Sequence, residues 1–356
     1  MASTSSNWPS RPSKLLNDYR NNRIGSNLQL TDLGDHVLEF ALDPRGSRFI
    51  EQKLGHANPT ETAHLMDALR GNVLTLSKNL YGSHVIQKAL ESVDRMSQIE
   101  ISNELSAHVI PLSRHEYGNW AIRCVLDNCT EHQKRPVLEQ LHDNVITLAT
   151  DQHGNFVIQH LITHGLPEDR ERIVRSLQEK VTSLSLHEYG NRVIRCALCP
   201  SMNTQKRPVL EQLHENVLSL VTDQHGCFVI EHVIEHGLLE DRERIVRSLQ
   251  GDIMKNGHLN SFCSVIYKCL IFGTTEQKNA LTDEVCADNG SGRPPLLEMM
   301  KHRFGNTVVQ KMLHVADSAR RNKMMFAIKT AQLKNTKNRS SESFNTVQAR
   351  QQRGGE

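Results

Sequence analysis

A short segment recurs along the chain, and one of its positions is occupied by flat side chains. Counting from the residue after the segment's first glycine, position two holds Arg48, His84, Trp120, Phe156, Arg192 and Phe228 in six copies. Aromatic rings and the planar guanidinium group can each stack on another flat ring, such as a nucleobase. Aromatic residues make up only 4% of the sequence. Their recurrence in one register therefore indicates a stacking function rather than chance.

A place in the apolar core is the alternative interpretation of position two. Arg48 and Arg192 argue against it, because arginine is rarely buried without a partner. Two further copies carry Ser264 and Thr307 at position two, and neither side chain has a flat face. We therefore predict stacking by position two in the first six copies only.

Positions one and five of the segment are polar in nearly every copy. They read Ser47 and Glu51, Ser83 and Gln87, Asn119 and Arg123, Asn155 and Gln159, Asn191 and Arg195, Cys227 and Glu231, Cys263 and Tyr267, and Asn306 and Gln310. Residues four apart on a helix share a face, so each pair can present donors and acceptors to the Watson–Crick edge of an unpaired base. Positions three and four are apolar. We therefore predict that positions one, two and five form an exposed edge over a buried core.

These segments belong to an internal repeat. Residues 107–178 match residues 179–250 at 49 of 72 positions without a gap, and each of these stretches contains two 36-residue halves. The same period extends to eight copies, with seven extra residues before the last copy in a turn-rich stretch at 287–295. Apolar residues recur with helical spacing, and strand signals are absent. The pattern predicts an all-α protein built as an α-solenoid.

Several motifs resemble those of the Pumilio (PUF) homology domain. They include "LLNDYRNNR" (15–23), "YGSHVIQKALE" (81–91), "DQHGNFVIQH" (151–160) and "VVQKMLHVAD" (308–317). The resemblance implies a right-handed, crescent-shaped α-solenoid over residues 14–335, with flanking half-repeats around eight three-helix repeats. The expected repeats are 36–71, 72–107, 108–143, 144–179, 180–215, 216–251, 252–287 and 295–330. It also implies that the concave face binds single-stranded RNA, one base per repeat, with the RNA 5′ end at the last repeat.

The family's recognition code implies a partial target sequence. Asn with Gln resembles the uracil reader, as in Asn306/Gln310 and Asn155/Gln159. Ser or Cys with Glu resembles the guanine reader, as in Cys227/Glu231 and Ser47/Glu51, and Ser83/Gln87 resembles the adenine reader. From 5′ to 3′ the expected target is U-?-G-?-U-?-A-G. The Asn/Arg pairs partly resemble cytosine readers, whereas Cys263/Tyr267 matches no usual reader.

The resemblance further implies a post-transcriptional regulator that acts through mRNA 3′ untranslated regions and has no enzymatic activity. Repression or deadenylation factors are the expected partners of the convex face, and the protein is expected to be a cytoplasmic monomer without a membrane segment. Two other functions stay open, namely a peptide-binding solenoid of the armadillo type and an RNA binder without sequence preference. The net charge of +2 distinguishes none of these.

Other motifs that could carry chemistry are explained by the repeat. "HVIEH" (232–236) has the H-x-x-E-H spacing of some zinc hydrolases, but the equivalent stretch, "HLITH" (160–164), lacks the glutamate. "CALC" (196–199) has no second cysteine pair at zinc spacing. We therefore expect no metal, no cofactor and reduced cysteines. Residues 1–13 and the polar, basic tail at 336–356 are expected to be disordered.

Overall fold

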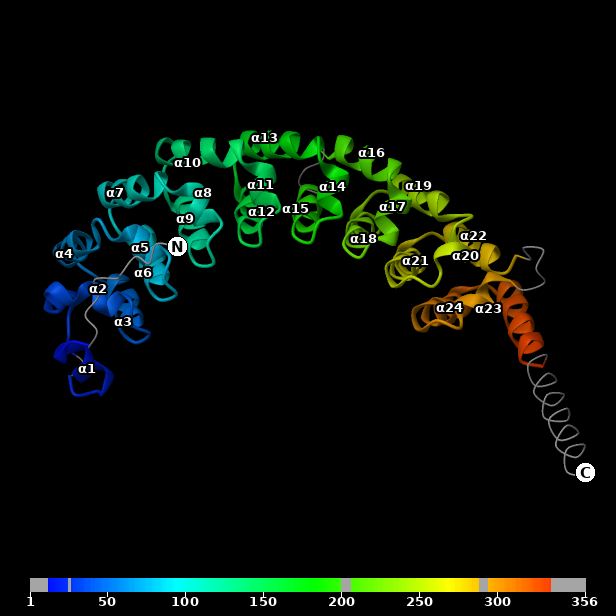
Figure 1. Ribbon diagram of the computed structural model, residues 1–356, viewed down its shortest axis with the longest axis horizontal. Helices are drawn as coiled ribbons and strands as arrows, with labels where there is room; N and C mark the ends of the chain where they lie inside the picture. The colour runs from blue at the N-terminus through cyan, green and yellow to red at the C-terminus, as the bar shows by residue number, and fades with distance from the viewer. Residues whose placement is uncertain (1–11, 25–26, 200–205, 288–293, 334–356) are drawn as a thin grey trace, which may run out of the picture. The chain divides into compact units, whose positions relative to one another are not determined.

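The computed structural model describes residues 12–24, 27–199, 206–287 and 294–333. Within these ranges every regular element is a helix (Figure 1). The chain divides into two compact units, Met1–Lys180 and Val181–Glu356. Each unit is built from consecutive sets of three helices, so the predicted α-solenoid of eight three-helix repeats is confirmed.

The first unit opens with α1 (Lys14–Arg20) and the 3₁₀ helix η1 (Leu30–His36), and four repeats follow. Their helices, three to a repeat, are α2 (Val37–Ala41), α3 (Gly46–Leu54) and α4 (Pro59–Leu69); α5 (Val73–Ser77), α6 (Gly82–Ser92) and α7 (Arg95–Ser106); α8 (Val109–Ser113), α9 (Gly118–Asn128) and α10 (Glu131–Asp143); α11 (Val145–Ala149), α12 (Gly154–His164) and α13 (Pro167–Gln178).

The second unit contains the remaining four repeats in the same order of helices. They are α14 (Val181–Ser185), α15 (Gly190–Ala197) and α16 (Arg207–Glu215); α17 (Val217–Thr222), α18 (Gly226–His236) and α19 (Leu239–Leu249); α20 (Ile253–Asn256), α21 (Asn260–Phe272) and α22 (Thr275–Val285); α23 (Pro295–Met299), α24 (Arg303–Val315) and a last helix whose described part covers residues 318–333.

The middle helix of each repeat carries the recurring segment, and we call these eight the reader helices. They are α3, α6, α9 and α12 in the first unit, and α15, α18, α21 and α24 in the second. In the first unit, α3, α6, α9 and α12 pack against one another in turn, while the long helices α4, α7, α10 and α13 lie on the other side (Figure 1). Ile86, Ile122 and Ile158 at position four are fully buried, and each such residue contributes about 1.5–3 kcal/mol of hydrophobic stabilisation.

A glycine begins most reader helices because the short helix before it packs directly against that point. A Cβ on Gly226 would lie 2.7 Å from the carbonyl oxygen of Leu220, which is closer than real side chains approach. Repeat seven carries the fully buried Phe262 at the equivalent position. Its short helix α20 has only four residues, and its reader helix α21 begins at Asn260, ahead of Phe262. The seventh repeat therefore keeps the helical plan with different packing at this junction.

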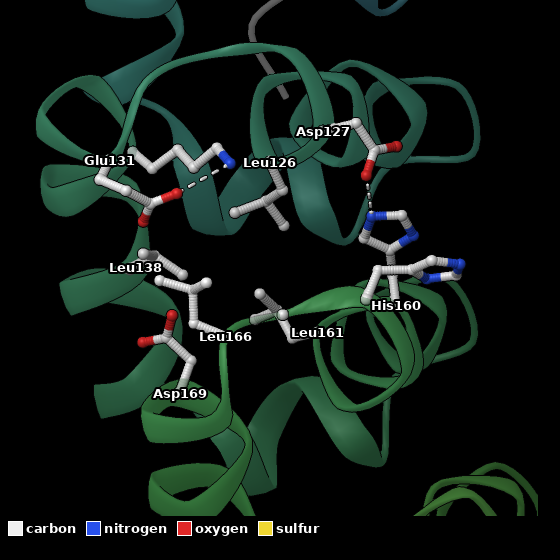
Figure 2. Close-up of a pocket in the computed structure, with 11 residues that line it drawn as sticks. Leu126, Asp127, Glu131, Leu138, His160, Leu161, Leu166 and Asp169 are labelled. Atoms are coloured by element: carbon white, nitrogen blue, oxygen red, sulfur yellow. Dashed lines mark hydrogen bonds and ion pairs between the residues drawn. The ribbon is translucent and has the colours of Figure 1, made fainter. Parts of the chain in front are cut away.

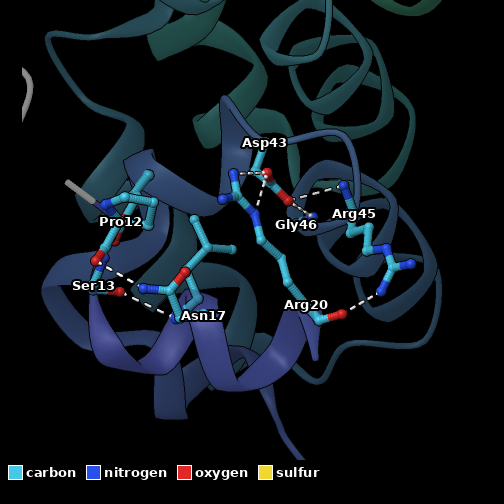
Figure 3. Close-up of polar contacts among 9 residues, drawn as sticks. Pro12, Ser13, Asn17, Arg20, Asp43, Arg45 and Gly46 are labelled. Carbon is cyan, nitrogen blue, oxygen red and sulfur yellow. Dashed lines mark hydrogen bonds and ion pairs between the residues drawn. The ribbon is translucent and has the colours of Figure 1, made fainter. Parts of the chain in front are cut away.

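Polar contacts fix α1 onto the first repeat (Figure 3). Arg20 Nε donates a 2.9 Å hydrogen bond to Asp43 Oδ2, and the Arg45 guanidinium donates to the carbonyl oxygen of Arg20. Asp43 Oδ1 accepts from the amides of Arg45 (2.9 Å) and Gly46 (2.8 Å). Burial by itself would raise the pKa of Asp43, but Arg20 and these two amides outweigh it and hold the pKa below its usual value. The Asp43 carboxylate thus joins α1 to the start of the first reader helix.

Some expectations fall on residues outside the described ranges. These include nearly all of the N-terminal segment 1–13, the tail 336–356 and most of the inserted stretch at 287–295. Among the residues that the structure describes, no helix is both long enough and apolar enough to span a membrane.

Candidate nucleic-acid interface

The loop before a reader helix is closed by a side chain three residues ahead of the glycine. In repeat four, Asp151 Oδ1 accepts hydrogen bonds of 2.9 and 2.8 Å from the amides of His153 and Gly154. In repeat three, His115 Nδ1 accepts from the two equivalent amides at 3.2 and 3.3 Å. Burial and the charge of Lys78 lower the pKa of His115, which favours the neutral ring that an acceptor requires. The residues in this role are Asp43, Asn79, His115, Asp151, His187 and Asp223.

Position one is buried in seven repeats, so the prediction that it is exposed is wrong there. The exposed fraction is only 0–3% at Ser47, Ser83, Asn119, Asn155, Asn191, Cys227 and Cys263. Asn119 Nδ2 donates to the carbonyl oxygens of His115 (3.0 Å) and Glu116 (2.8 Å), and Asn155 and Asn191 make the same two bonds to their own loops. A side chain this early in a helix points back toward the N-terminus and therefore lies over the loop.

Position two is exposed in the six repeats with a flat side chain there, which excludes the interpretation that it belongs to the core. The exposed fractions are 48% for Trp120, 40% for Phe156 and 47% for Phe228. Arg48, His84 and Arg192 are exposed as well. Because successive reader helices of a unit pack side by side, the first unit presents a row of four flat side chains, and the second unit presents Arg192 and Phe228 next to each other.

The exposure of position five is intermediate between the burial of position one and the exposure of position two. It is half-buried in seven repeats and exposed at Gln310. Where position one is asparagine, its amide oxygen can orient position five. Arg123 Nη2 donates to Asn119 Oδ1 at 3.1 Å, and Gln159 Nε2 donates to Asn155 Oδ1 at 2.7 Å. In these repeats the buried residue therefore positions the accessible one.

The two Asn/Arg repeats hold their guanidinium groups differently. The Arg123 guanidinium carbon lies 4.0 Å from the ring centre of Trp120 in its own repeat. The Arg195 guanidinium carbon lies 6.0 Å from the ring centre of Phe228 in the next repeat. The Nε atoms of both arginines are buried and lack an acceptor among the described residues. Both repeats thus hold a half-buried guanidinium group whose Nε–H is shielded from solvent.

Repeats six and seven are joined by a contact between their reader positions. Ser264 Oγ, at position two of repeat seven, donates a 2.6 Å hydrogen bond to Glu231 Oε1, at position five of repeat six. The neighbouring Cys227 thiol donates to the carbonyl oxygen of Gln224 at 3.5 Å, and burial together with Glu231 raises its pKa to about 11. The thiol is therefore neutral at physiological pH, and the carboxylate of Glu231 supplies the charged acceptor of this pair.

The histidine motifs lie on the same helices at the far end from the loop. In the first unit a pocket is lined by Leu126, Leu161 and Leu166, and His160 Nε2 lies 2.8 Å from Asp127 Oδ1 beside it (Figure 2). In the second unit Cys199 stands where Asp127 stands in the duplicated stretch.

His232 is the counterpart of His160, and its buried Nε2 consequently has no partner among the residues that the structure describes. Burial, together with the charges of His236 and Arg195, lowers the pKa of His232 to about 4. Glu235, the glutamate of "HVIEH", forms an ion pair with Lys268 at 2.7 Å. Within the described residues no group of three side chains is placed to bind a metal ion. Glu235 thus links two neighbouring reader helices.

One exposed aromatic residue on a reader helix was missed by the sequence pattern. Phe304 precedes the glycine of repeat eight and is 42% exposed, close to the value for Phe156. The equivalent residues Tyr81, Tyr117, His153, Tyr189 and His225 are all half-buried. In the sequence, the only indication of a further stacking surface was this aromatic residue, three positions before Thr307, whose own side chain cannot stack.

Comparison with known proteins places this geometry in a family. A family model for the Pumilio-family RNA binding repeat matches residues 108–142, 144–177, 180–214, 216–249, 263–286 and 296–328, and a NOP9-like PUF repeat domain model matches residues 35–108. The first model alone covers more than half of the chain. The fold and site therefore define a PUF-repeat protein, and the chain belongs to the Pumilio (PUF) family.

Individual relatives agree with this assignment. Pumilio homolog 2 of Xenopus laevis is 58% identical over 53 residues, which are 15% of this chain and 4% of that protein. The match thus spans only a small part of that relative's length. The crystal structure of PUF-8 in complex with PBE-RNA has a TM-score of 0.78 and 30% identity, covering 89% of this chain and 93% of that one. The Puf3 RNA binding domain bound to Cox17 RNA 3′ UTR recognition sequence site A has a TM-score of 0.77 and 26% identity, covering 90% and 96%.

Proposed function

We propose that the protein binds single-stranded RNA on its reader helices, one base per repeat, with the 5′ end at repeat eight. The observation that carries this proposal is the repeated pairing of an exposed flat side chain with a half-buried polar one, as at Phe156 and Gln159. The flat side chain stacks on a base, and the polar one meets the base edge. The RNA complexes of PUF-8 and of the Puf3 domain support the same use of this fold.

The proposed target is 5′-U-?-G-?-U-?-A-G-3′. Glu231 reads guanine because a carboxylate accepts hydrogen bonds from the N1–H and N2–H groups of that base. Gln159 and Gln310 read uracil, Gln87 reads adenine, and Glu51 reads the final guanine. The buried position-one residues act mainly by supporting these side chains.

Repeats three and five are proposed to read cytosine. Arg123 and Arg195 place half-buried guanidinium groups, which are pure donors, at position five, and cytosine presents the O2 and N3 acceptors. Arg123 lies over Trp120 and must move aside, or the base must stack on the other face of the ring. With cytosine at these repeats, the target becomes 5′-UNGCUCAG-3′, where N is the nucleotide at repeat seven.

Binding to such sites in 3′ untranslated regions would make the protein a cytoplasmic post-transcriptional regulator of mRNA. The surface of the long helices, which lies away from the reader helices within each unit, is the proposed place for repression or deadenylation factors. The protein is proposed to act as a monomer and to need no catalytic group for this role.

The test is selection of bound sequences from a random single-stranded RNA pool, followed by binding measurements on single variants. Enrichment of U, G, U and A-G at the proposed spacing is the expected result. Glu231→Gln should shift the preference at the third nucleotide from guanine to adenine by about tenfold. The matched control is Glu235→Gln, which alters a glutamate one turn further along α18 that is ion-paired with Lys268.

Other outcomes separate the alternatives. RNA enrichment without a motif would indicate binding without sequence preference. If no RNA is retained, the proposed function is wrong, and a peptide would become the ligand to seek on the reader helices.

A further inference from the structure

The surface between reader helices α21 and α24 contains a cavity of about 180 Å³. Its lining includes Ser264 and Tyr267 from repeat seven, and Phe304 and Thr307 from repeat eight. These two helices pack directly against each other within the second unit. The cavity therefore lies between the position-two residues of two consecutive repeats, where a base read by repeat seven would be inserted.

The usual means of holding a base are absent from this cavity. Ser264 and Thr307 have no flat face, and their hydroxyl groups already donate elsewhere, to Glu231 Oε1 (2.6 Å) and to the carbonyl oxygen of Arg303 (3.1 Å). The position-one thiol of Cys263 is buried and donates to the carbonyl oxygen of Gly257 at 3.2 Å. No carboxylate lines the cavity, and the one amide of repeat seven in its lining is Asn260, one turn before Ser264 on α21; the walls are otherwise largely apolar.

Phe304 supplies the flat surface that position two lacks. It lies three residues before Thr307, so both side chains are on the same face of α24. Its exposed fraction of 42% falls within the range of Trp120 (48%) and Phe156 (40%). The Tyr267 ring also lines the cavity.

Two cations border these rings. The Arg303 guanidinium carbon is 5.9 Å from the Phe304 ring centre, and Lys311 Nζ is 5.7 Å from the Tyr267 ring centre. Neither cation forms an ion pair with the residues that the structure describes. Flat apolar walls next to free positive charges match a nucleotide, which has a flat base and a phosphate.

We propose that this cavity binds the second base of the RNA by stacking on Phe304, with little selection among the four bases. The inference rests on the proposed function and assigns the nucleotide left open at repeat seven. Selectivity is low because the position-one and position-five pair of this repeat, Cys263 and Tyr267, does not match a single base edge, and the Asn260 amide can rotate to present either its donor or its acceptor. Stacking of the base on the Phe304 ring supplies the affinity, and Arg303 and Lys311 lie close to the RNA backbone.

The experiment compares binding of 5′-UNGCUCAG-3′ RNAs that carry each of the four bases, or an abasic residue, at the second nucleotide. We expect the four bases to bind within about threefold of one another, and the abasic RNA to bind about tenfold more weakly. Phe304→Ala should weaken binding of the base-containing RNAs by about tenfold and leave the abasic RNA unchanged. With 2-aminopurine at this nucleotide, the wild-type protein should quench its fluorescence and Phe304→Ala should not.

Phe326→Ala is the matched control, because Phe326 is also exposed (73%) but lies on the last helix, outside the cavity. Its affinity for all five RNAs should equal that of the wild type, and thermal unfolding checks that both variants are folded. Equal binding of the abasic and base-containing RNAs, or a tenfold preference for one base, would overturn the inference alone. Failure of the wild-type protein to bind any RNA would overturn the proposed function itself.

Discussion

Repeats three and four contrast with repeats seven and eight in how they would hold a base. Repeats three and four present Trp120 and Phe156 at position two, above buried asparagines that orient position five. Repeats seven and eight have Ser264 and Thr307 there, and a cavity beside Phe304 takes the place of the flat side chains at position two. The three-helix plan is the same in both regions. The comparison therefore teaches that the side chains at position two can change while the three-helix plan beneath them is kept.

The largest expected effect is on the free energy of unfolding. It concerns the junction between the short helix and the reader helix, where repeat seven has Phe262 in place of a glycine. Phe262→Ala should destabilise the protein by about 3–5 kcal/mol, because it removes a fully buried ring. Gly226→Ala, at the equivalent position of repeat six, should cost about 1–3 kcal/mol by overpacking. Urea unfolding measures both changes. If Gly226→Ala proved neutral, the close approach of the short helix would not constrain that repeat.

The next largest effect is on RNA affinity and concerns the flat side chains at position two. Phe156→Ala should weaken RNA binding by about 1–3 kcal/mol, because one stacking surface is lost. Thr307→Ala should leave the affinity nearly unchanged, since Thr307 provides no stacking surface and its hydroxyl donates within its own helix. Equilibrium titrations of labelled RNA give both values. Equal losses in the two variants would abolish the contrast between the regions.

A smaller effect tests the contact that joins repeats six and seven. Ser264→Ala removes the 2.6 Å hydrogen bond to Glu231. Without it the carboxylate is less well oriented, and the preference for guanine over adenine at the third nucleotide should fall by roughly 1 kcal/mol. Thr307→Ala is the control, since that hydroxyl donates within its own helix. An unchanged guanine preference would show that Glu231 needs no help from repeat seven.

The smallest effect is a pH dependence specific to the duplicated repeats. The pKa of His115 is lowered in the folded protein, so its contribution to stability is present above its ordinary pKa, near 6.5, and is lost as pH falls below that value. Asn79 fills the same role in repeat two without titrating, by accepting from the amides of Tyr81 and Gly82. His115→Asn should therefore reduce the loss of thermal stability between pH 7 and pH 5.5. An identical loss in both proteins would mean that the His115 contact contributes little.

Much of this architecture could be predicted from the sequence because the repeat allows equivalent positions to be compared across eight copies. The 36-residue period and the register of position two indicated helices with Trp120 and Phe156 on an exposed face, as the structure has them. The burial of position one could not be read in the same way. Asparagine and serine are polar whether they face water or loop carbonyls, and only the folded loop supplies the carbonyls that accept from Asn119.

The Phe304 surface was missed for a different physical reason. Its function depends on the two neighbouring helices rather than on the period of one, and the equivalent residues Tyr117 and Tyr189 are half-buried in their loops. Likewise, the contact between Ser264 and Glu231 joins residues 33 apart in the sequence. Neither relationship appears when a repeat is analysed by itself.

The division of labour between positions one and five has a consequence for how new targets can evolve. Position one is buried in seven repeats and in most of them bonded to the loop, so we expect its substitution to disturb folding, and the chain uses only Ser, Asn and Cys there. Position five is accessible and varies among Glu, Gln, Arg and Tyr. Under the proposed function, a duplicated repeat would therefore come to prefer another base through a substitution at position five alone, with its stability preserved. Duplication followed by substitution at position five would then change the proposed RNA target one nucleotide at a time over evolution.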